Sequence, residues 1–112
     1  MKMKKYMLKN GKPIICNNLL EWASWFERLE NRKIAETTIE GIRVSTVFLG
    51  LDHNYFEEGL PILWETMIFG GGEEIDEYQV RYASQEEAEA GHQAAVLLVE
   101  ATLKKRKFKL ED

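Results

Sequence analysis

The sequence is poor in the residues on which several common kinds of site depend. Among its 112 residues it has one cysteine, Cys16, and two histidines, His53 and His92. A single cysteine excludes an internal disulfide and is typical of a protein kept in the reducing cytoplasm, where we expect this one. One cysteine and two histidines cannot form a closed structural zinc site without other ligands. We therefore expect neither a structural metal nor a cofactor.

Long apolar runs and nucleotide-binding motifs are also missing. The longest apolar run, Ala94–Val99, is far shorter than the roughly 20 residues that a membrane-spanning helix needs. The first residues, Met1–Leu8, have a basic flank but no apolar core or cleavage site of a signal peptide. Gly70-Gly71-Gly72 lacks the lysine and the following helix of a phosphate-binding loop. These absences argue against a membrane protein and against a nucleotide-dependent enzyme.

The charges are unevenly distributed along the chain. The net charge is -4, yet five basic residues lie between Lys2 and Lys12 and five between Lys104 and Lys109. Between Ile34 and Leu103 the chain has 14 acidic residues and only two basic ones. An acidic body repels nucleic acid, which argues against direct DNA or RNA binding. The basic ends have three explanations: they neutralise the acidic body, they pair with another copy in a homodimer, or they contact phosphates weakly.

The fold is predicted from two β-rich segments at the centre of the chain. Ile42–Leu51 begins by alternating apolar and polar residues, and Pro61–Phe69 returns after a short polar loop, which is typical of a hairpin. Asn10-Gly11 predicts a second, N-terminal hairpin, because both residues tolerate positive φ. Glu40-Gly41 predicts a turn directly into the central strand.

The complete prediction is one α+β domain over residues 1–112. An antiparallel β-meander of at least four strands is expected, with two helices packed mainly on one face and the hairpin at an edge or end. The expected strands are Ile34–Glu40, Ile42–Leu51, Pro61–Phe69 and Tyr78–Ala83. Asn18 should cap the first helix and Ser84 the second, which should run to about Lys105 and leave residues 108–112 as a tail. The predicted core comprises Trp22, Phe26, Val47, Phe48, Leu49, Trp64, Ile68, Val80, Val96 and Val99.

One group of polar residues is a candidate site. Asp52 and His53 lie in the central loop, Glu65 lies in an otherwise apolar strand, and His92 lies on the sheet-facing side of the second helix. An unpaired carboxylate in such a strand is costly, so we expect Glu65 to face solvent or to pair with His92. Such a pair can be a general base, half of a metal site, or a buried contact that fixes helix to sheet.

The same segments carry a resemblance. Val44–His53, Glu65–Gly71 and Glu86–His92 resemble, in the same order, segments of a group of small uncharacterised proteins from bacteriophage and prophage genomes. The resemblance covers most of the chain, from the first helix to the second. It implies a phage-related, intracellular setting and no particular reaction.

The favoured function is therefore a non-enzymatic, protein-binding accessory factor whose partner is a host or phage protein. Acidic loops on both sides of Pro61–Phe69 are the expected partner surface, because acidic patches attract basic partners. They should form two clusters at opposite ends of the strand. The alternative is a small-molecule or metal-binding protein, or an enzyme, that uses Asp52, His53, Glu65 and His92. The acidic residues of the two loops that form the expected partner surface are Glu57, Glu58, Glu73, Glu74, Asp76 and Glu77.

Overall fold

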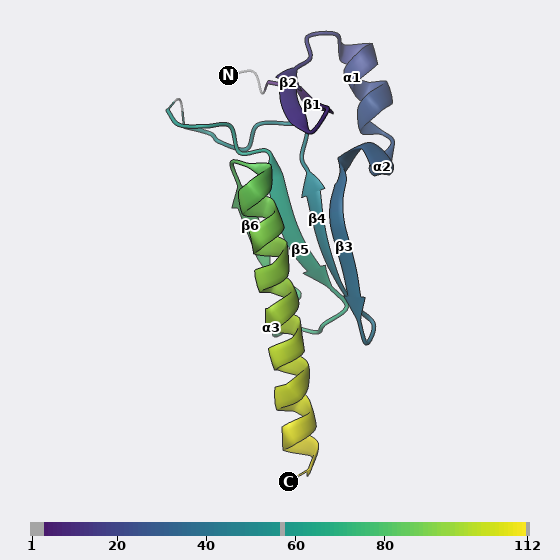
Figure 1. The fold of residues 1–112 in the computed structure, drawn as a ribbon, viewed down its shortest axis with the longest axis vertical. Coiled ribbons are helices and arrows are strands. Elements are labelled where there is room, and N and C mark those ends of the chain that lie inside the picture. The colour runs from purple at the N-terminus through teal and green to yellow at the C-terminus, as the bar shows by residue number, and fades with distance from the viewer. Residues whose placement is uncertain (1–3, 57, 112) are drawn as a thin grey trace.

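A computed structural model describes residues 4–56 and 58–111 of the chain. The molecule is elongated, with principal extents of 58 × 29 × 22 Å. A four-stranded sheet and a long C-terminal helix lie side by side, and a small N-terminal unit sits at one end of the sheet (Figure 1). In chain order the elements are β1 (Tyr6–Lys9), β2 (Lys12–Ile15), α1 (Leu19–Phe26), α2 (Leu29–Arg32), β3 (Lys33–Ile39), β4 (Ile42–Phe48), β5 (Trp64–Phe69), β6 (Gln79–Tyr82) and α3 (Gln85–Glu111).

The predicted α+β fold is confirmed. Strands β3, β4, β5 and β6 pair in sequence order, and each neighbouring pair is antiparallel. Glu40 and Gly41 make the predicted turn from β3 to β4 with φ angles of 46° and 85°, values that a tight hairpin turn requires. Of these four strands, only β3 and β4 are joined by a two-residue turn, whereas nine residues connect β5 to β6 and 15 connect β4 to β5.

The N-terminal hairpin is attached at an end of the sheet, as predicted. Asn10 and Gly11 form its turn with φ angles of 53° and 77°. The amide of Tyr6 donates to the carbonyl of Gly50, 2.8 Å away, just after β4. Gly50 itself lies against the rings of Phe26 and Trp22. These contacts fix β1 and α1 to the exit of the central strand.

The first helix packs differently from the prediction, which placed both helices on the sheet. Asn18 caps α1 by accepting the amide of Glu21 at 3.0 Å, as expected, but the helix ends at Phe26 and a separate turn, α2, follows. Trp22 stacks on Phe26, and its indole N–H donates to the Tyr6 carbonyl at 3.0 Å. Trp22 thus packs on the hairpin, whereas Trp25 of the same helix packs edge-on against Phe48 of β4, 5.9 Å between ring centroids.

Helix α3 covers one face of the four-stranded sheet. Ser84 caps it by accepting the amide of Glu87 at 3.1 Å, as predicted. Ala88, Ala95 and Val99 are fully buried against the strands. The helix continues beyond Lys105 to Glu111, because lysine and arginine are good helix formers and no glycine or proline interrupts the run. Residues 108–111, predicted as part of a tail, belong to this helix, and its last turns extend past the sheet (Figure 1).

The predicted core is confirmed at the centre of the sheet, is only partly buried at its margins, and is wrong at Val80. Four of the predicted residues are buried: Phe48, Trp64, Ile68 and Val99. Val80 is 37% exposed, because β6 is a short edge strand that only the first part of α3 covers. The remaining predicted residues are partly buried: Trp22, Phe26, Val47, Leu49 and Val96.

Candidate functional site

The predicted contact between Glu65 and His92 does not exist. Alternate residues of β5 point to opposite faces of the sheet, and Glu65 lies between Trp64 and Thr66, which both face α3. The Glu65 carboxylate accepts hydrogen bonds from Arg81 Nε at 2.9 Å and from Gln79 Nε2 at 2.8 Å on the other face. His92 belongs to α3 and is only 1% exposed. The sheet therefore separates the two side chains.

Asp52 and His53 organise the loop between β4 and β5. One carboxylate oxygen of Asp52 accepts the amides of Asn54 at 2.8 Å and Ile62 at 3.0 Å. The Nδ1–H of His53 donates to the Leu51 carbonyl at 2.8 Å. The bond from Ile62 to Asp52 ties the two ends of the loop together, and the His53 bond is local to its first end. Neither residue is brought to Glu65 or His92.

The alternative of a metal or catalytic site at these four residues loses its geometric basis. They are divided among a loop and the two opposite faces of the sheet. Within residues 4–56 and 58–111, no three His, Cys, Asp or Glu side chains are grouped so that they could hold a metal ion.

His92 instead belongs to a chain of hydrogen bonds from Tyr82 to Thr37 that the sequence analysis did not predict. The Tyr82 hydroxyl donates to Thr66 Oγ1 at 3.0 Å, Thr66 and Thr46 are joined at 2.6 Å, and Thr46 lies 2.7 Å from His92 Nδ1. His92 Nε2 lies 2.9 Å from the hydroxyl of Thr37. The chain joins all four strands of this sheet to α3 on the covered face. A signal for it was available: Thr46 and Thr66 occupy inward positions of strands whose alternation is clear.

Two directions satisfy these hydrogen bonds with a neutral ring, because each hydroxyl has one proton to donate and can accept twice. In the first, Thr66 accepts from Tyr82 and donates to Thr46, Thr46 donates to Nδ1 of His92, and the ring donates from Nε2 to Thr37. In the second, the ring donates from Nδ1 to Thr46, Thr46 donates to Thr66, and Nε2 accepts from Thr37. Burial lowers the pKa of His92, which is consistent with this neutral state and with a role in packing.

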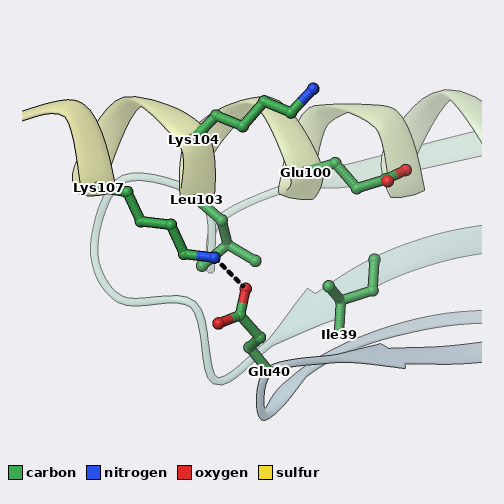
Figure 2. A pocket seen from close by; sticks show the side chains of 6 residues that line it. All are labelled: Ile39, Glu40, Glu100, Leu103, Lys104 and Lys107. Atoms are coloured by element: carbon green, nitrogen blue, oxygen red, sulfur yellow. Dashed lines mark hydrogen bonds and ion pairs between the residues drawn. The ribbon is translucent and has the colours of Figure 1, made fainter.

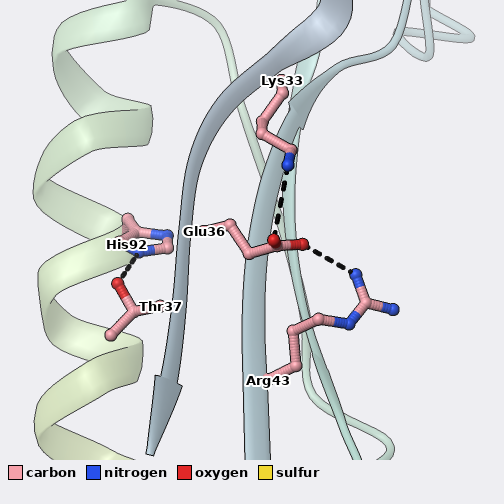
Figure 3. Close-up of polar contacts among 5 residues, drawn as sticks. All are labelled: Lys33, Glu36, Thr37, Arg43 and His92. Carbon is pink, nitrogen blue, oxygen red and sulfur yellow. Dashed lines mark hydrogen bonds and ion pairs between the residues drawn. The ribbon is translucent and has the colours of Figure 1, made fainter. Parts of the chain in front are cut away.

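The other face of the sheet is the larger candidate surface, which we call the open face. Within the described ranges, no helix or other strand packs across it as α3 packs on the opposite side. Strand register places its side chains in three rows, which are Lys33, Val47, Glu65 and Arg81; Glu36, Ser45, Met67 and Gln79; and Thr38, Arg43 and Phe69. Figure 3 shows this division at β3, where Glu36 points to the open face and Thr37 points to His92.

Ion pairs hold the charged side chains of the open face in place. Glu36 accepts from Arg43 Nη1 at 3.1 Å and from Lys33 Nζ at 3.3 Å (Figure 3). The hydrogen bond from Arg43, followed by that from Lys33, lowers the pKa of the Glu36 carboxyl. The Arg43 guanidinium also lies over the ring of Phe69, 4.5 Å from its centroid. The face thus presents partly buried Met67 and Val47 and exposed Phe69 among paired charges.

The acidic loops occupy opposite ends of β5, as predicted, but two of their carboxylates, Glu74 and Asp76, already have partners within the chain. Glu58 precedes the strand, and Glu57 lies outside the described residues. In the loop after β5, Asp76 accepts the Gly71 amide at 2.6 Å, and Glu74 lies 3.8 Å from Arg106 of α3. Glu73 and Glu77 are exposed. The basic end of α3 therefore neutralises part of this loop.

A shallow groove lies between α3 and the turn from β3 to β4. Its volume is about 160 Å³, below the range of roughly 300–1,000 Å³ usual for small-molecule sites. The ion pair between Lys107 and Glu40, 3.4 Å long, crosses it (Figure 2). Ile39 and Leu103 line its apolar part. Its size and this ion pair make the groove a poor small-molecule site.

Comparison with protein families, curated proteins and solved structures finds no match for this chain. Among the described residues, no helix is both long and apolar enough to span a membrane.

Proposed function

We propose that this protein is a non-enzymatic binding factor that recognises another protein through the open face of its sheet. The observation that carries the proposal is the composition of this face. Phe69 and Met67 lie beside Arg43 and Arg81 on one uncovered surface, and aromatic residues, methionine and arginine are enriched in protein interfaces. A catalytic role has less support, because the titratable groups of the predicted site are separated.

The paired arginines of this face also support binding. Arg43 is held by Glu36 and by the ring of Phe69, and Arg81 is held by Glu65. Side chains that are already ordered lose less conformational entropy when a partner binds. The open face would therefore present a fixed pattern of apolar and paired charged groups.

The acidic loop after β5 suggests the charge of the partner. It follows Phe69 directly along the chain, so Glu73 and Glu77 lie near one end of the open face. A partner with basic residues around an apolar centre would match both features. The resemblance to phage and prophage proteins makes a host or phage protein in the cytoplasm the natural choice.

Affinity purification from the natural host with two matched variants tests the open face. Phe69→Ser removes an exposed ring from it, and Phe56→Ser removes an exposed ring from the loop before β5. A true partner should be retained by the wild type and by Phe56→Ser and lost with Phe69→Ser. Partners retained equally by all three proteins would contradict the proposal.

A second experiment separates the acidic loop from the open face. Glu73→Lys combined with Glu77→Lys reverses two exposed charges, whereas Asp76 must be kept because it accepts the Gly71 amide. The affinity for the purified partner should fall, and the remaining binding should depend less on salt. Unchanged affinity would remove the acidic loop from the interface and leave the open face to be judged by Phe69→Ser. Tight, salt-sensitive binding of the wild type to duplex DNA or RNA would contradict the protein-binding proposal itself.

A further inference from the structure

Helix α3 has a second apolar side that the fold does not use. Its buried side faces the sheet through Ala88, Ala95 and Val99. Leu97 is 66% exposed and Phe108 is 68% exposed. At about 100° per residue, these two side chains point away from the sheet. A single exposed leucine in the middle of a helix is common. The spacing of its neighbours therefore decides whether this side is suited to pairing with another helix.

The neighbours of Leu97 repeat as in a coiled coil. Steps of four and three residues alternate along this side of α3, which is the heptad spacing that lets two helices pack along a common line. We call this set the outer seam. It consists of Glu87, Ala90, Ala94, Leu97, Ala101, Lys104 and Phe108, all of which are exposed.

The seam is long enough for two helices to pair over several turns. Helix α3 has 27 residues, or about 40 Å at 1.5 Å per residue, and its C-terminal turns extend past the sheet (Figure 1). Alanine at three seam positions allows two helix backbones to approach closely. Leu97 near the middle then has a place between the alanines of a facing helix.

The charges of the seam determine the orientation of the pair. Glu87 lies in the first turn of α3, and Lys104 lies more than four turns later. In a parallel pair each of these charges would meet its own kind. In an antiparallel pair each Glu87 meets a Lys104. The acidic first turn and the basic last turns of α3 favour the same orientation.

We propose that two copies of this chain associate through their outer seams as an antiparallel helix pair. A two-fold axis midway between Ala94 and Leu97 places each Leu97 against Ala94 of the second copy. The same axis places Ala90 against Ala101 and Glu87 against Lys104. The two sheets lie on the outside of such a dimer, so both open faces remain accessible. The inference is independent of the proposed function.

Sedimentation equilibrium tests the seam. The wild type should have a mass of about 26 kDa, twice the 13.0 kDa of one chain, at concentrations up to about 100 µM. Leu97→Glu should weaken association at least about tenfold. Leu20→Glu, the same change at an exposed position of α1, should leave it unchanged. A monomeric wild type, or a Leu97→Glu protein that associates as tightly, would overturn the proposal.

Charge exchange tests the orientation. Glu87→Lys and Lys104→Glu should each weaken self-association, because each creates two like-charge contacts across the pair. Mixing the two variants should restore association, and so should combining both changes in one chain. In a parallel pair the combined change would restore nothing. Circular dichroism of each variant checks that α3 is intact, and failure of both restorations with intact helices would overturn the antiparallel arrangement.

Discussion

Gly91 of α3 lies directly against the phenol of Tyr82 on β6. A Cβ at residue 91 would overlap the hydroxyl and two ring carbons of Tyr82. The Tyr82 ring cannot easily move away, because it is buried and its hydroxyl donates to Thr66. The absence of a side chain at one position of the helix thus allows the hydrogen-bond chain of the covered face to form.

Gly91→Ala should therefore destabilise the protein even though alanine is the better helix former. The substitution gains about 1 kcal/mol in helix propensity, but overpacking of a buried contact typically costs about 1–3 kcal/mol. We expect a net loss of stability in urea unfolding. In a Tyr82→Leu background the clash is relieved, so the same substitution should become neutral or stabilising. A gain of stability in the wild-type background would contradict the close contact.

The place of Thr66 in the hydrogen-bond chain predicts the order of two further variants. Thr66→Val removes the acceptor of Tyr82 and also the partner of Thr46, and it should cost about 1–3 kcal/mol. Tyr82→Phe removes only the first donor of the chain and should cost less. Urea unfolding with unchanged slopes gives both free energies. Equal costs, or a reversed order, would contradict the central place of Thr66 in the chain.

Strand alternation accounts both for the predicted meander and for the absence of a Glu65–His92 contact. Period-two alternation in the predicted strands Ile42–Leu51 and Pro61–Phe69 gave the meander and its central pair correctly. The same alternation places Glu65 on the face opposite Trp64, which rules out contact with a helix on the Trp64 side. Helix α3 packs on that side, so Glu65 and His92 occupy opposite faces of the sheet.

Other differences depend on tertiary packing that local sequence does not contain. Whether Trp22 and Phe26 pack on the sheet or on the hairpin depends on the position of α1. The close contact of Gly50 with their rings helps to fix that position. The exposure of Val80 depends on β6 being the last strand of the sheet. The partner of the open face depends on complementarity to a second surface, so neither the sequence nor the fold of this chain specifies it.

Removing Arg81 from its ion pair with Glu65 should destabilise the protein more than removing Glu65. Glu65 is 7% exposed, so Arg81→Met leaves a largely buried carboxylate with Gln79 as its remaining side-chain donor. This change should cost about 1–3 kcal/mol. Glu65→Met should cost less, because Arg81 can turn to solvent.

Replacing both residues by methionine should be less costly than replacing Arg81 alone. The double variant leaves no unpaired buried charge, and such paired replacements are often nearly neutral. A double-mutant cycle in urea measures the coupling between the two residues. A double variant less stable than Arg81→Met would show that Glu65 is stabilised mainly by groups other than Arg81.

The buried histidine predicts how stability depends on pH. Burial lowers the pKa of His92 below its usual value of 6.5, so the unfolded chain binds a proton at a higher pH than the folded chain does. The unfolded state then holds more protons between these two pKa values, and the free energy of unfolding falls as pH decreases through that interval. The stabilisation is fully present above pH 6.5 and is lost toward the lower pKa of the folded state.

Urea unfolding at a series of pH values from about 7.5 to 5 measures this dependence. His92→Gln removes the titrating ring but keeps a side chain that can donate and accept, so its stability should change less over the same range. His53→Gln serves as the matched control, because it removes the other histidine from a more exposed loop and should retain the wild-type slope. Direct observation of the His92 ring by NMR should show the neutral form at neutral pH, and the nitrogen that carries the proton identifies the direction of the chain from Tyr82 to Thr37. A pKa above 6.5 would contradict the effect of burial on this ring.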